Sequence, residues 1–358
     1  MSQVIRVRAA HALSRDRFCL ALHTEEMGDN FSIILQYDAR NPDMPWSRTE
    51  RNRKIDSICA YEEPGKETGF AVLSRGGDVY LIQGLDVINE KIPDASLCSD
   101  IKSINGALWV CGMGEQVYER LGAHSWKQIP MNGIENPTGF DTVDFESIGG
   151  TANNDIYVCG DVSGKSVKSD PKISKAIDDA EERRDKEEYL RLKKLDRQQR
   201  QALEKDPEGR IYHWDGHAWD DLSLEAFFPD DLYVESADKV YIGATGCSFL
   251  SGNAEDGFDD WFVHDDMGKV HSITTFRGNV VCSTSYGLFT YKEGPDDTDG
   301  TGQALIPTLK KQNNSSSPLK VQTVDDVMFY FDYDFGVYIW DGKDEWTNIP
   351  VPKKLRKR

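Results

Sequence analysis

IKSINGALWVCGMGEQVY at residues 101–118, followed by WKQI at 126–129, is the clearest copy of a pattern that recurs along this chain. Each copy has an apolar segment, a turn of Gly, Asn or Asp, a segment rich in β-branched and aromatic residues, and a Gly-containing turn. A Val-Tyr pair or its equivalent follows, and then a Trp; the last copy spans residues 327–346. Repeats of about 20–50 residues are typical of folds in which identical supersecondary units bury each other's apolar faces.

The spacing of these copies predicts the number of units. Most intervals between successive third strands are about 40 to 50 residues, which is the length of one four-stranded propeller blade. The interval from Tyr118 to Tyr212 is about twice as long, because a charged segment at 165–208 lies inside it. The sequence therefore predicts an all-β fold, a seven-bladed β-propeller with a long helical insertion in blade four. The third strands are expected near Tyr37, Tyr80, Tyr118, Tyr212, Leu250, Phe289 and Tyr338.

Turn and strand residues agree with this assignment. Asp215-Gly216 and Asp341-Gly342 are two-residue hairpin signals, because a type I′ turn needs positive φ at both central positions. The expected second strands are runs of β-branched and aromatic residues, which suit a pleated, half-buried surface. Trp recurs on the expected fourth strands, where a bulky ring packs between neighbouring sheets. These residues are Trp46, Trp126, Trp219, Trp261 and Trp346.

The chain resembles β-propellers over nearly its whole length. Trp214-Asp215 and Trp340-Asp341 stand at the ends of expected third strands, where WD-type repeats carry the same dipeptide. Five of the seven units lack the pair, and the upstream Gly-His of a WD repeat is missing, so the resemblance indicates a divergent propeller of no specific subfamily. We expect one propeller domain over 1–352, interrupted by the insertion at 165–208, and a basic C-terminal tail at 353–358.

The charge of the chain is unevenly distributed. The formal net charge is −19, but the segment 165–208 carries about +1 and the tail 353–358 carries about +5, which leaves about −25 on the blades. A field of this size repels nucleic acid and anionic membranes and attracts basic proteins. Two interpretations stay open: the charge serves solubility alone, or one face of the propeller is an acidic binding surface.

Cysteine content and the N-terminal residues bear on the compartment. The seven cysteines are odd in number and too widely spaced for a zinc motif. Cys111, Cys159 and Cys282 fall in expected inner strands, where a free thiol behaves as a small buried apolar group. The first eight residues lack the apolar stretch of a signal peptide, and no apolar run has the roughly 18 residues that a membrane span needs. We expect a cytoplasmic protein.

The insertion has the composition of a helix. Residues 172–205 contain neither Gly nor Pro and are rich in Ala, Glu, Lys, Arg, Leu and Gln. Ile173, Ile177 and Leu192 belong to a thin apolar line, and Arg184 belongs to the charged pairs beside it. By resemblance to other propellers, loops between second and third strands lie on the face that usually binds ligands. The insertion is therefore either a partner-contacting helix or a solvated addition.

The same loops of the other units give a candidate binding face. Acidic side chains alternate there with aromatic ones, which suits a basic protein surface because Tyr provides rigid contact area. Taken singly, each is also an ordinary turn residue. The candidates, with Arg75 beside them, are Glu25, Glu26, Asp29, Met113, Glu115, Tyr286, Asp332, Tyr333 and Asp334.

No motif indicates catalysis, a metal or a cofactor. His213 and His217 flank an expected hairpin, and no Glu accompanies them as in a zinc hydrolase. The sequence thus indicates a non-catalytic, acidic protein-binding module, and in one specific version an immunity protein that neutralises a basic toxin. A scaffold subunit of a larger complex is one alternative. A propeller enzyme, a hydrolase or lyase with its site in the central channel, is the other. The oligomeric state is left open.

Overall fold

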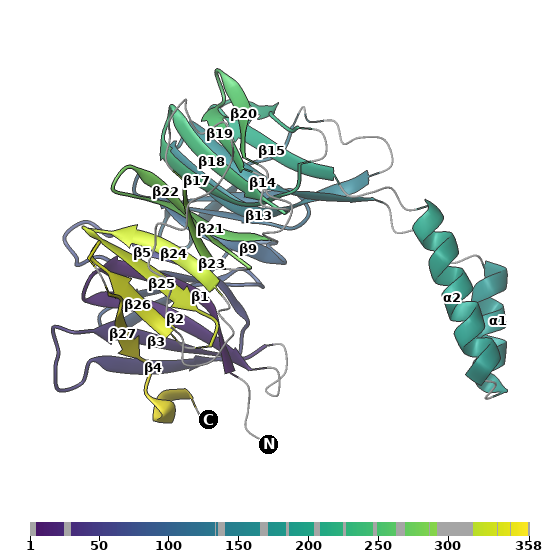
Figure 1. Cartoon of the computed structure of the whole chain (residues 1–358), viewed down its shortest axis with the longest axis horizontal. Helices are drawn as coiled ribbons and strands as arrows, with labels where there is room; N and C mark the ends of the chain where they lie inside the picture. Colours follow the sequence, from purple (N-terminus) through teal and green to yellow (C-terminus); the bar gives the residue numbers. More distant parts are fainter. Residues whose placement is uncertain are drawn as a thin grey trace.

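The computed structural model describes residues 5–24, 30–132, 134, 140–164, 171–183, 186–203, 208–224, 227–245, 249–262, 269–285, 287–291, 318–334, 336–343 and 345–356. Over these ranges the chain forms seven antiparallel sheets, each with its strands in sequence order (Figure 1). The first strand of each sheet lies against the first strands of both neighbouring sheets, and that of the seventh lies against that of the first. The ring is closed, and the predicted seven-bladed propeller is confirmed.

The strand bounds follow the repeat. Blade 1 contains β1 (Ile5–Ser14), β2 (Arg17–Thr24), β3 (Ser32–Asp38) and β4 (Trp46–Arg51). Blade 2 contains β5 (Ile55–Tyr61), β6 (Gly69–Ser74), β7 (Asp78–Gln83) and β8 (Asp86–Lys91). Blade 3 contains β9 (Cys98–Ile104), β10 (Ala107–Gly112), β11 (Gln116–Gly122) and β12 (Ser125–Gln128). Blade 4 contains β13 (Phe140–Ala152), β14 (Asp155–Gly164), β15 (Glu208–Trp214) and β16 (Trp219–Asp221).

The last three blades continue the order. Blade 5 contains β17 (Pro229–Ser236), β18 (Lys239–Ala244), β19 (Phe249–Asn253) and β20 (Gly257–Phe262). The described part of blade 6 contains β21 (Val270–Phe276), β22 (Asn279–Thr284) and β23 (Gly287–Tyr291). Blade 7 contains β24 (Pro318–Val324), β25 (Val327–Asp332), β26 (Gly336–Trp340) and β27 (Thr347–Pro350). All seven residues expected in third strands lie in them, and Trp346 alone of the five tryptophans lies just before its fourth strand.

The core consists of one apolar cluster between each pair of neighbouring blades. The second strands show why their sequences are apolar throughout. On β10, Trp109 and Cys111 pack toward blade 4, whereas Leu108 and Val110 pack toward blade 2. Successive side chains of a strand point to opposite faces, so a strand between two blades needs apolar residues at every position.

The described cysteines belong to this packing. All six are free and buried. Burial raises the pKa of the Cys59 and Cys98 thiols to about 12, so at neutral pH they are uncharged. Thiols of this kind act as small apolar side chains rather than as nucleophiles or metal ligands.

Ring closure depends on side-chain packing, because blade 7 is built entirely from C-terminal strands and blade 1 entirely from N-terminal strands. One cluster joins them, and Phe18 of β2 lies at its centre. Its ring centroid is 6.1 Å from that of Phe329 and 6.2 Å from that of Phe331, both on β25. The N–H of Val7 also donates to the carbonyl of Tyr333 at 3.0 Å. We call this contact the closing seam.

The C-terminal residues reach the closing seam as well. A short 3₁₀ helix, η2 (Lys353–Arg356), follows blade 7, and Leu355 packs against the apolar cluster of the seam. Val351 is buried in the same cluster. The described part of the basic tail is therefore in contact with the propeller.

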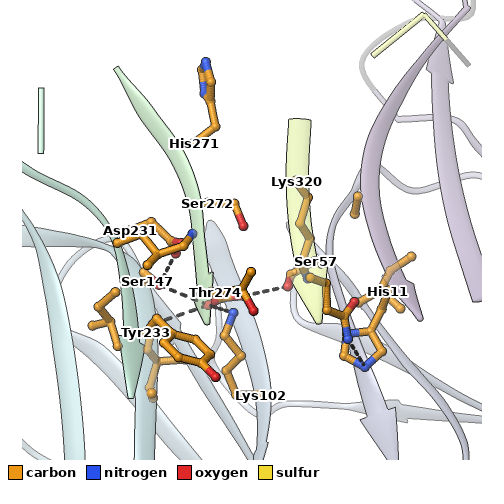
Figure 2. A pocket seen from close by; sticks show the side chains of 18 of the residues that line it. His11, Ser57, Lys102, Ser147, Asp231, Tyr233, His271, Ser272, Thr274 and Lys320 are labelled. Atoms are coloured by element: carbon orange, nitrogen blue, oxygen red, sulfur yellow. Dashed lines mark hydrogen bonds and ion pairs between the residues drawn. The ribbon is translucent and has the colours of Figure 1, made fainter. Parts of the chain in front are cut away.

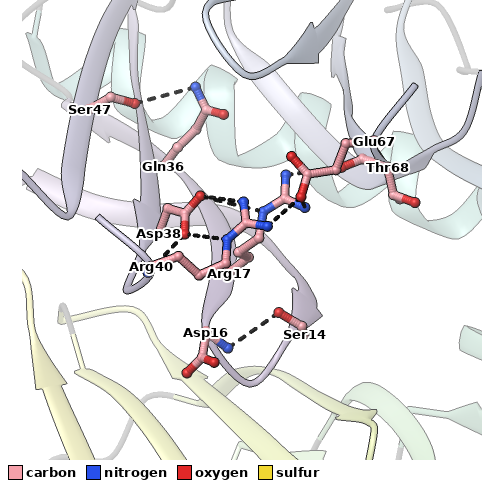
Figure 3. Close-up of polar contacts among 9 residues, drawn as sticks. All are labelled: Ser14, Asp16, Arg17, Gln36, Asp38, Arg40, Ser47, Glu67 and Thr68. Carbon is pink, nitrogen blue, oxygen red and sulfur yellow. Dashed lines mark hydrogen bonds and ion pairs between the residues drawn. The ribbon is translucent and has the colours of Figure 1, made fainter. Parts of the chain in front are cut away.

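Blades 1 and 2 are also joined by an ionic contact at their rim (Figure 3). Arg17 Nη1 lies 2.9 Å from Glu67 Oε1, and Arg17 Nη2 donates to the carbonyl of Thr68 at 3.0 Å. Arg40 pairs with the same carboxylate and with Asp38. Both arginines therefore bridge blade 1 to the loop before β6.

Two helices, α1 (Pro171–Glu182) and α2 (Lys186–Leu203), lie in the chain between β14 and β15. The sequence favoured one continuous helix over 172–205, and this detail is wrong, since the chain turns at Arg183 and α2 packs on α1. Ile177, Ala180 and Leu192 form their shared apolar cluster. Each apolar stripe is too narrow to bury a lone helix, so the two stripes cover each other. Figure 1 shows this pair beside the blades and clear of them. No helix of the described ranges has the length and hydropathy of a membrane span.

Candidate functional site

A channel runs between the first strands of the seven blades. Figure 2 shows side chains from part of its wall. Its cavity has a volume of about 420 Å³ and is lined by residues of β1, β5, β9, β13, β17, β21 and β24. A cavity of this size is in the range of small-molecule sites. The polar residues in its wall fall into two groups, one that joins the blades and one that carries charge.

Asp100 on β9 joins three blades. Its Oδ1 accepts a hydrogen bond from Ser57 Oγ of blade 2 at 2.6 Å. Its Oδ2 accepts from the N–H of Ile148, on blade 4, at 3.3 Å and from Ser147 Oγ at 3.5 Å. Lys102 Nζ lies 3.0 Å from the same oxygen. Both carboxylate oxygens are therefore occupied by groups of neighbouring blades.

Asp231 on β17 repeats this arrangement two blades further on. Its Oδ1 accepts from Ser147 Oγ at 3.0 Å, and its Oδ2 accepts from the N–H of Ile273, on blade 6, at 3.0 Å. Burial raises the pKa of the Asp231 carboxyl, and the positive charge of Lys102 opposes that rise. Ser147 thus lies between the two carboxylates and links them.

Further hydrogen bonds continue this ring through blades 6, 7 and 1. Ser272 Oγ donates to the carbonyl of Val321 at 3.0 Å. The side-chain oxygen of Gln322 accepts a hydrogen bond from the N–H of Ala12 at 2.9 Å, and its side-chain nitrogen donates to the carbonyl of Ala12 at 3.0 Å. We call this set of bonds the channel girdle. Its side chains are Ser57, Asp100, Ser147, Asp231, Ser272, Thr274 and Gln322.

Two lysines bring positive charge into the channel. Burial opposes the charged form of Lys102, but attraction to Asp100 and Asp231 outweighs it and raises the pKa of this ammonium group. Burial and repulsion from Lys102 lower the pKa of Lys320 to about 8. Burial and both lysines hold the pKa of His11 well below its usual range, so its imidazole is neutral.

The channel opens on the face that carries the second-to-third-strand loops. A mouth cavity of about 330 Å³ there shares Arg8, Asp56 and Glu146 with the channel. Two ion pairs lie at this opening. Arg8 Nε is 3.2 Å from Asp56 Oδ1, and Lys269 Nζ is 2.6 Å from the Oδ1 of Asp230.

Asp161 on β14 completes an acidic group beside the mouth. Burial, with repulsion from Asp230 and Glu146, raises the pKa of its carboxyl to about 6. Its Oδ1 is buried and has no hydrogen-bond partner among the described residues. We call Glu146, Asp161 and Asp230 the acidic mouth cluster. The positive charge of Lys269 opposes the rise in the pKa of Asp161 but does not outweigh burial and the neighbouring carboxylates.

Replacing Asp161 by Asn is expected to stabilise the protein at pH 7 by about 1 kcal/mol. A carboxyl whose pKa is raised from 3.8 to about 6 by folding destabilises the folded state as pH rises through that window. The full shift corresponds to about 3 kcal/mol, which we reduce because Asp161 is partly exposed. Urea unfolding at pH 7 should show the gain, and unfolding at pH 3.5 should not. An Asp161→Asn protein that is less stable than the unchanged chain at pH 7 would contradict the inference that the Asp161 carboxylate destabilises the folded state.

The structure places several predicted loop residues at this mouth. Met113, Tyr333 and Arg75 line the mouth cavity. Glu115 has a φ of 61°, and its N–H donates to the carbonyl of Val143 at 2.8 Å, which joins blade 3 to blade 4. Its loop is therefore held in place by a neighbouring blade.

The other predicted residues of blade 7 are partly structural. Asp332 is 1% exposed and accepts a hydrogen bond from the N–H of Asp334 at 2.7 Å, which shapes the loop that presents Asp334 to solvent. The remaining predicted loop residues, Glu25, Glu26, Asp29 and Tyr286, lie outside the described residues.

The predicted residues of the insertion lie mostly inside the helical pair. Ile177 and Leu192 are buried between α1 and α2, and Ile173 packs at the edge of the same cluster. Arg184 lies outside the described residues. These apolar residues hold the two helices together. They can therefore affect a partner contact only indirectly, by maintaining the shape of the helical pair.

Sequence reasoning missed the charged residues of the first strands. Asp100 and Lys102 are two positions apart on β9, so they share one face of that strand, and this spacing was a usable signal. Asp231 and Lys320 stand near the starts of β17 and β24, and their meeting with Asp100 and Lys102 depends on ring closure. Among the side chains that the structure describes, no three His, Cys, Asp or Glu are grouped to hold a metal ion.

Comparison with known sequences gives one informative similarity. No family model matches the chain. A segment of 125 residues is 30% identical to Immune protein Tsi7 of Pseudomonas aeruginosa, and it covers 33% of this chain and 38% of that protein. The chain thus matches well under half the length of this curated relative.

Solved structures share the fold at low identity. The WD40 β-propeller domain of Doa1 matches with a TM-score of 0.59 and 10% identity, over 99% of this chain and 96% of that domain. A structure of YCF48 bound to D1 peptide matches with a TM-score of 0.55 and 8% identity, over 93% of this chain and 91% of that one. These similarities establish the propeller architecture alone.

Proposed function

We propose that this chain is a cytoplasmic protein-binding module that neutralises a basic protein toxin, and that the mouth face of the propeller contacts the toxin. The similarity to Immune protein Tsi7 carries this proposal. The similar structure of YCF48 has a D1 peptide bound, which supports a protein partner for a fold of this kind.

The acidic mouth cluster supports a basic partner. Glu146, Asp161 and Asp230 lie together at the rim of the channel, where burial and then repulsion from Asp230 and Glu146 raise the pKa of Asp161. A Lys or Arg side chain placed beside them would lower that pKa, because a nearby positive charge favours the ionised carboxylate. Complementary charge of this kind raises association rates and selects against acidic partners.

The helical pair α1–α2 is the second contact element of the proposal. It is inserted between β14 and β15, and β14 carries Asp161 at its distal end, toward the insertion. The pair has its own apolar cluster, so its shape does not depend on the blades. Two α2 leucines, Leu190 and Leu195, remain exposed and are available to a partner.

The test combines capture from the native cell with quantitative binding of the captured protein. Glu146→Gln combined with Asp161→Asn removes two charges without a large change in volume, and deletion of 171–203 removes the helical pair. Each is expected to weaken binding at low salt by about 100-fold. Glu62→Gln, at an exposed position on the opposite opening of the ring, is the control and should bind as the unchanged chain does.

The same captured protein distinguishes the alternatives. An immunity function requires that the captured protein is basic, that it harms cells when expressed alone, and that co-expression of this chain restores growth. A harmless partner bound at fixed stoichiometry would instead indicate a scaffold subunit. Equal binding by the double variant and the control would refute the acidic contact.

A further inference from the structure

Lys320 is the unexplained charge of the channel. It lies on β24 in the channel wall, among the residues drawn in Figure 2. No described carboxylate forms an ion pair with its ammonium group, although Lys102 in the same cavity is paired with Asp100 at 3.0 Å. After burial, the strongest effect on the pKa of its ammonium group is repulsion from Lys102, which attraction to Asp100 and Asp231 opposes. A cation in this position lowers the stability of the empty channel.

The carboxylates of the channel cannot relieve this charge without breaking the girdle. Asp100 is held by Ser57, Ile148 and Lys102. Asp231 is held by Ser147 and the N–H of Ile273. Because these bonds connect blades 2 to 6, the two carboxylates are fixed in the wall, and they attract Lys320 without pairing with it directly.

The surroundings of Lys320 offer donors and space. Thr274 Oγ1 accepts a hydrogen bond from the N–H of Thr323 at 3.2 Å, which leaves its own proton for another acceptor. Lys102 keeps 32% of its side chain accessible in the channel, so it can donate to a second group besides Asp100. The cavity of about 420 Å³ continues into the mouth cavity, which gives a ligand a route of entry.

We propose that the central channel binds a small molecule through an oxyanion, a carboxylate or a phosphate, held between Lys320 and Lys102 with the Thr274 hydroxyl as a further donor. Two ammonium groups and a hydroxyl around one cavity match the several acceptor oxygens of such a group. The ligand places negative charge beside Lys320, which has no ion-pair partner among the described residues, so binding stabilises the closed ring. The residues of this site differ from the acidic mouth cluster proposed to contact the toxin, although Glu146 and Asp230 of that cluster line the same cavity.

The experiment measures binding and thermal stability with inorganic phosphate and with succinate as probes. Calorimetric titration of the full chain should show one saturable site, with a dissociation constant near or below about 1 mM for at least one probe. That probe should also raise the melting temperature in a concentration-dependent way. Comparison of the two probes tells a phosphate site from a carboxylate site.

Lys320→Met is the decisive variant, and Lys343→Met, at a side chain that is 81% exposed, is its matched control. Without a probe, Lys320→Met should melt at or above the temperature of the unchanged chain, because a repelled cation is replaced by an apolar chain of similar length. Its affinity for the probe should fall at least tenfold, while Lys343→Met keeps the original affinity. Absence of saturable binding by either probe, or equal binding by both variants, would overturn the proposal.

Discussion

Replacing Phe18 by Ala is expected to lower the free energy of unfolding by about 4 kcal/mol, the largest loss that we expect from a single side chain. Phe18 is fully buried in the closing seam. Its ring stacks on Tyr37 at a centroid distance of 4.7 Å and meets Phe329 and Phe331 edge-on across the seam. Truncation therefore leaves a cavity between blades that no shared strand holds together.

Urea unfolding followed by tryptophan fluorescence measures this loss. Leu85→Ala is the control, because Leu85 is 97% exposed and its truncation removes no packing. Terminal blades that separate early should also be cut faster by protease in the Phe18 variant than in the control. A Phe18→Ala protein with an unchanged unfolding midpoint would show that the seam adds little to ring stability.

The architecture could be predicted from the sequence because short strand and turn motifs recur in each blade. The seven third strands were identified from a Val-Tyr pair or its equivalent, and Gly and Asp-Gly turns separated the strands. Each blade repeats the same order of strands and turns, so an unclear motif in one unit can be assigned from the equivalent positions of the other units. The apolar second strands followed from the same logic, since each lies between two blades.

The candidate site could be predicted only in part. Met113 and Tyr333 do line the mouth cavity, because their loops sit at equivalent places in the repeat. The channel residues were missed, since Asp100, Asp231 and Lys320 are separated by up to two thirds of the chain and meet only when the ring closes. The turn at Arg183 was missed for another reason: no Gly or Pro marks it, and the helix folds back to cover a narrow apolar stripe.

Replacing Asp100 by Ala is expected to lower the free energy of unfolding by about 3 kcal/mol. The change removes the acceptor for Ser57 and for the buried N–H of Ile148, so the bonds that Asp100 makes to blades 2 and 4 are lost together. It also leaves Lys102 without its ion-pair partner at 3.0 Å. An unsatisfied buried donor costs about 1–3 kcal/mol, and the partial exposure of Lys102 keeps the total near the lower end of that sum.

Two comparisons test whether the loss of stability in Asp100→Ala comes from the broken bonds of the channel girdle or only from the removed charge. Asp86→Ala removes an exposed carboxylate of the outer strand β8 and should leave the unfolding midpoint unchanged. Asp100→Asn keeps one acceptor oxygen and should fall between Asp100→Ala and the unchanged chain, because its amide group turns two donors toward groups that also donate. Equal stability of Asp100→Ala and Asp86→Ala would mean that the blades hold together without the girdle. A stability loss that grows from Asp86→Ala through Asp100→Asn to Asp100→Ala would instead show that the Asp100 carboxylate keeps three blades in register. The shape of the channel would then depend on the same bonds that keep Asp100 from pairing with Lys320.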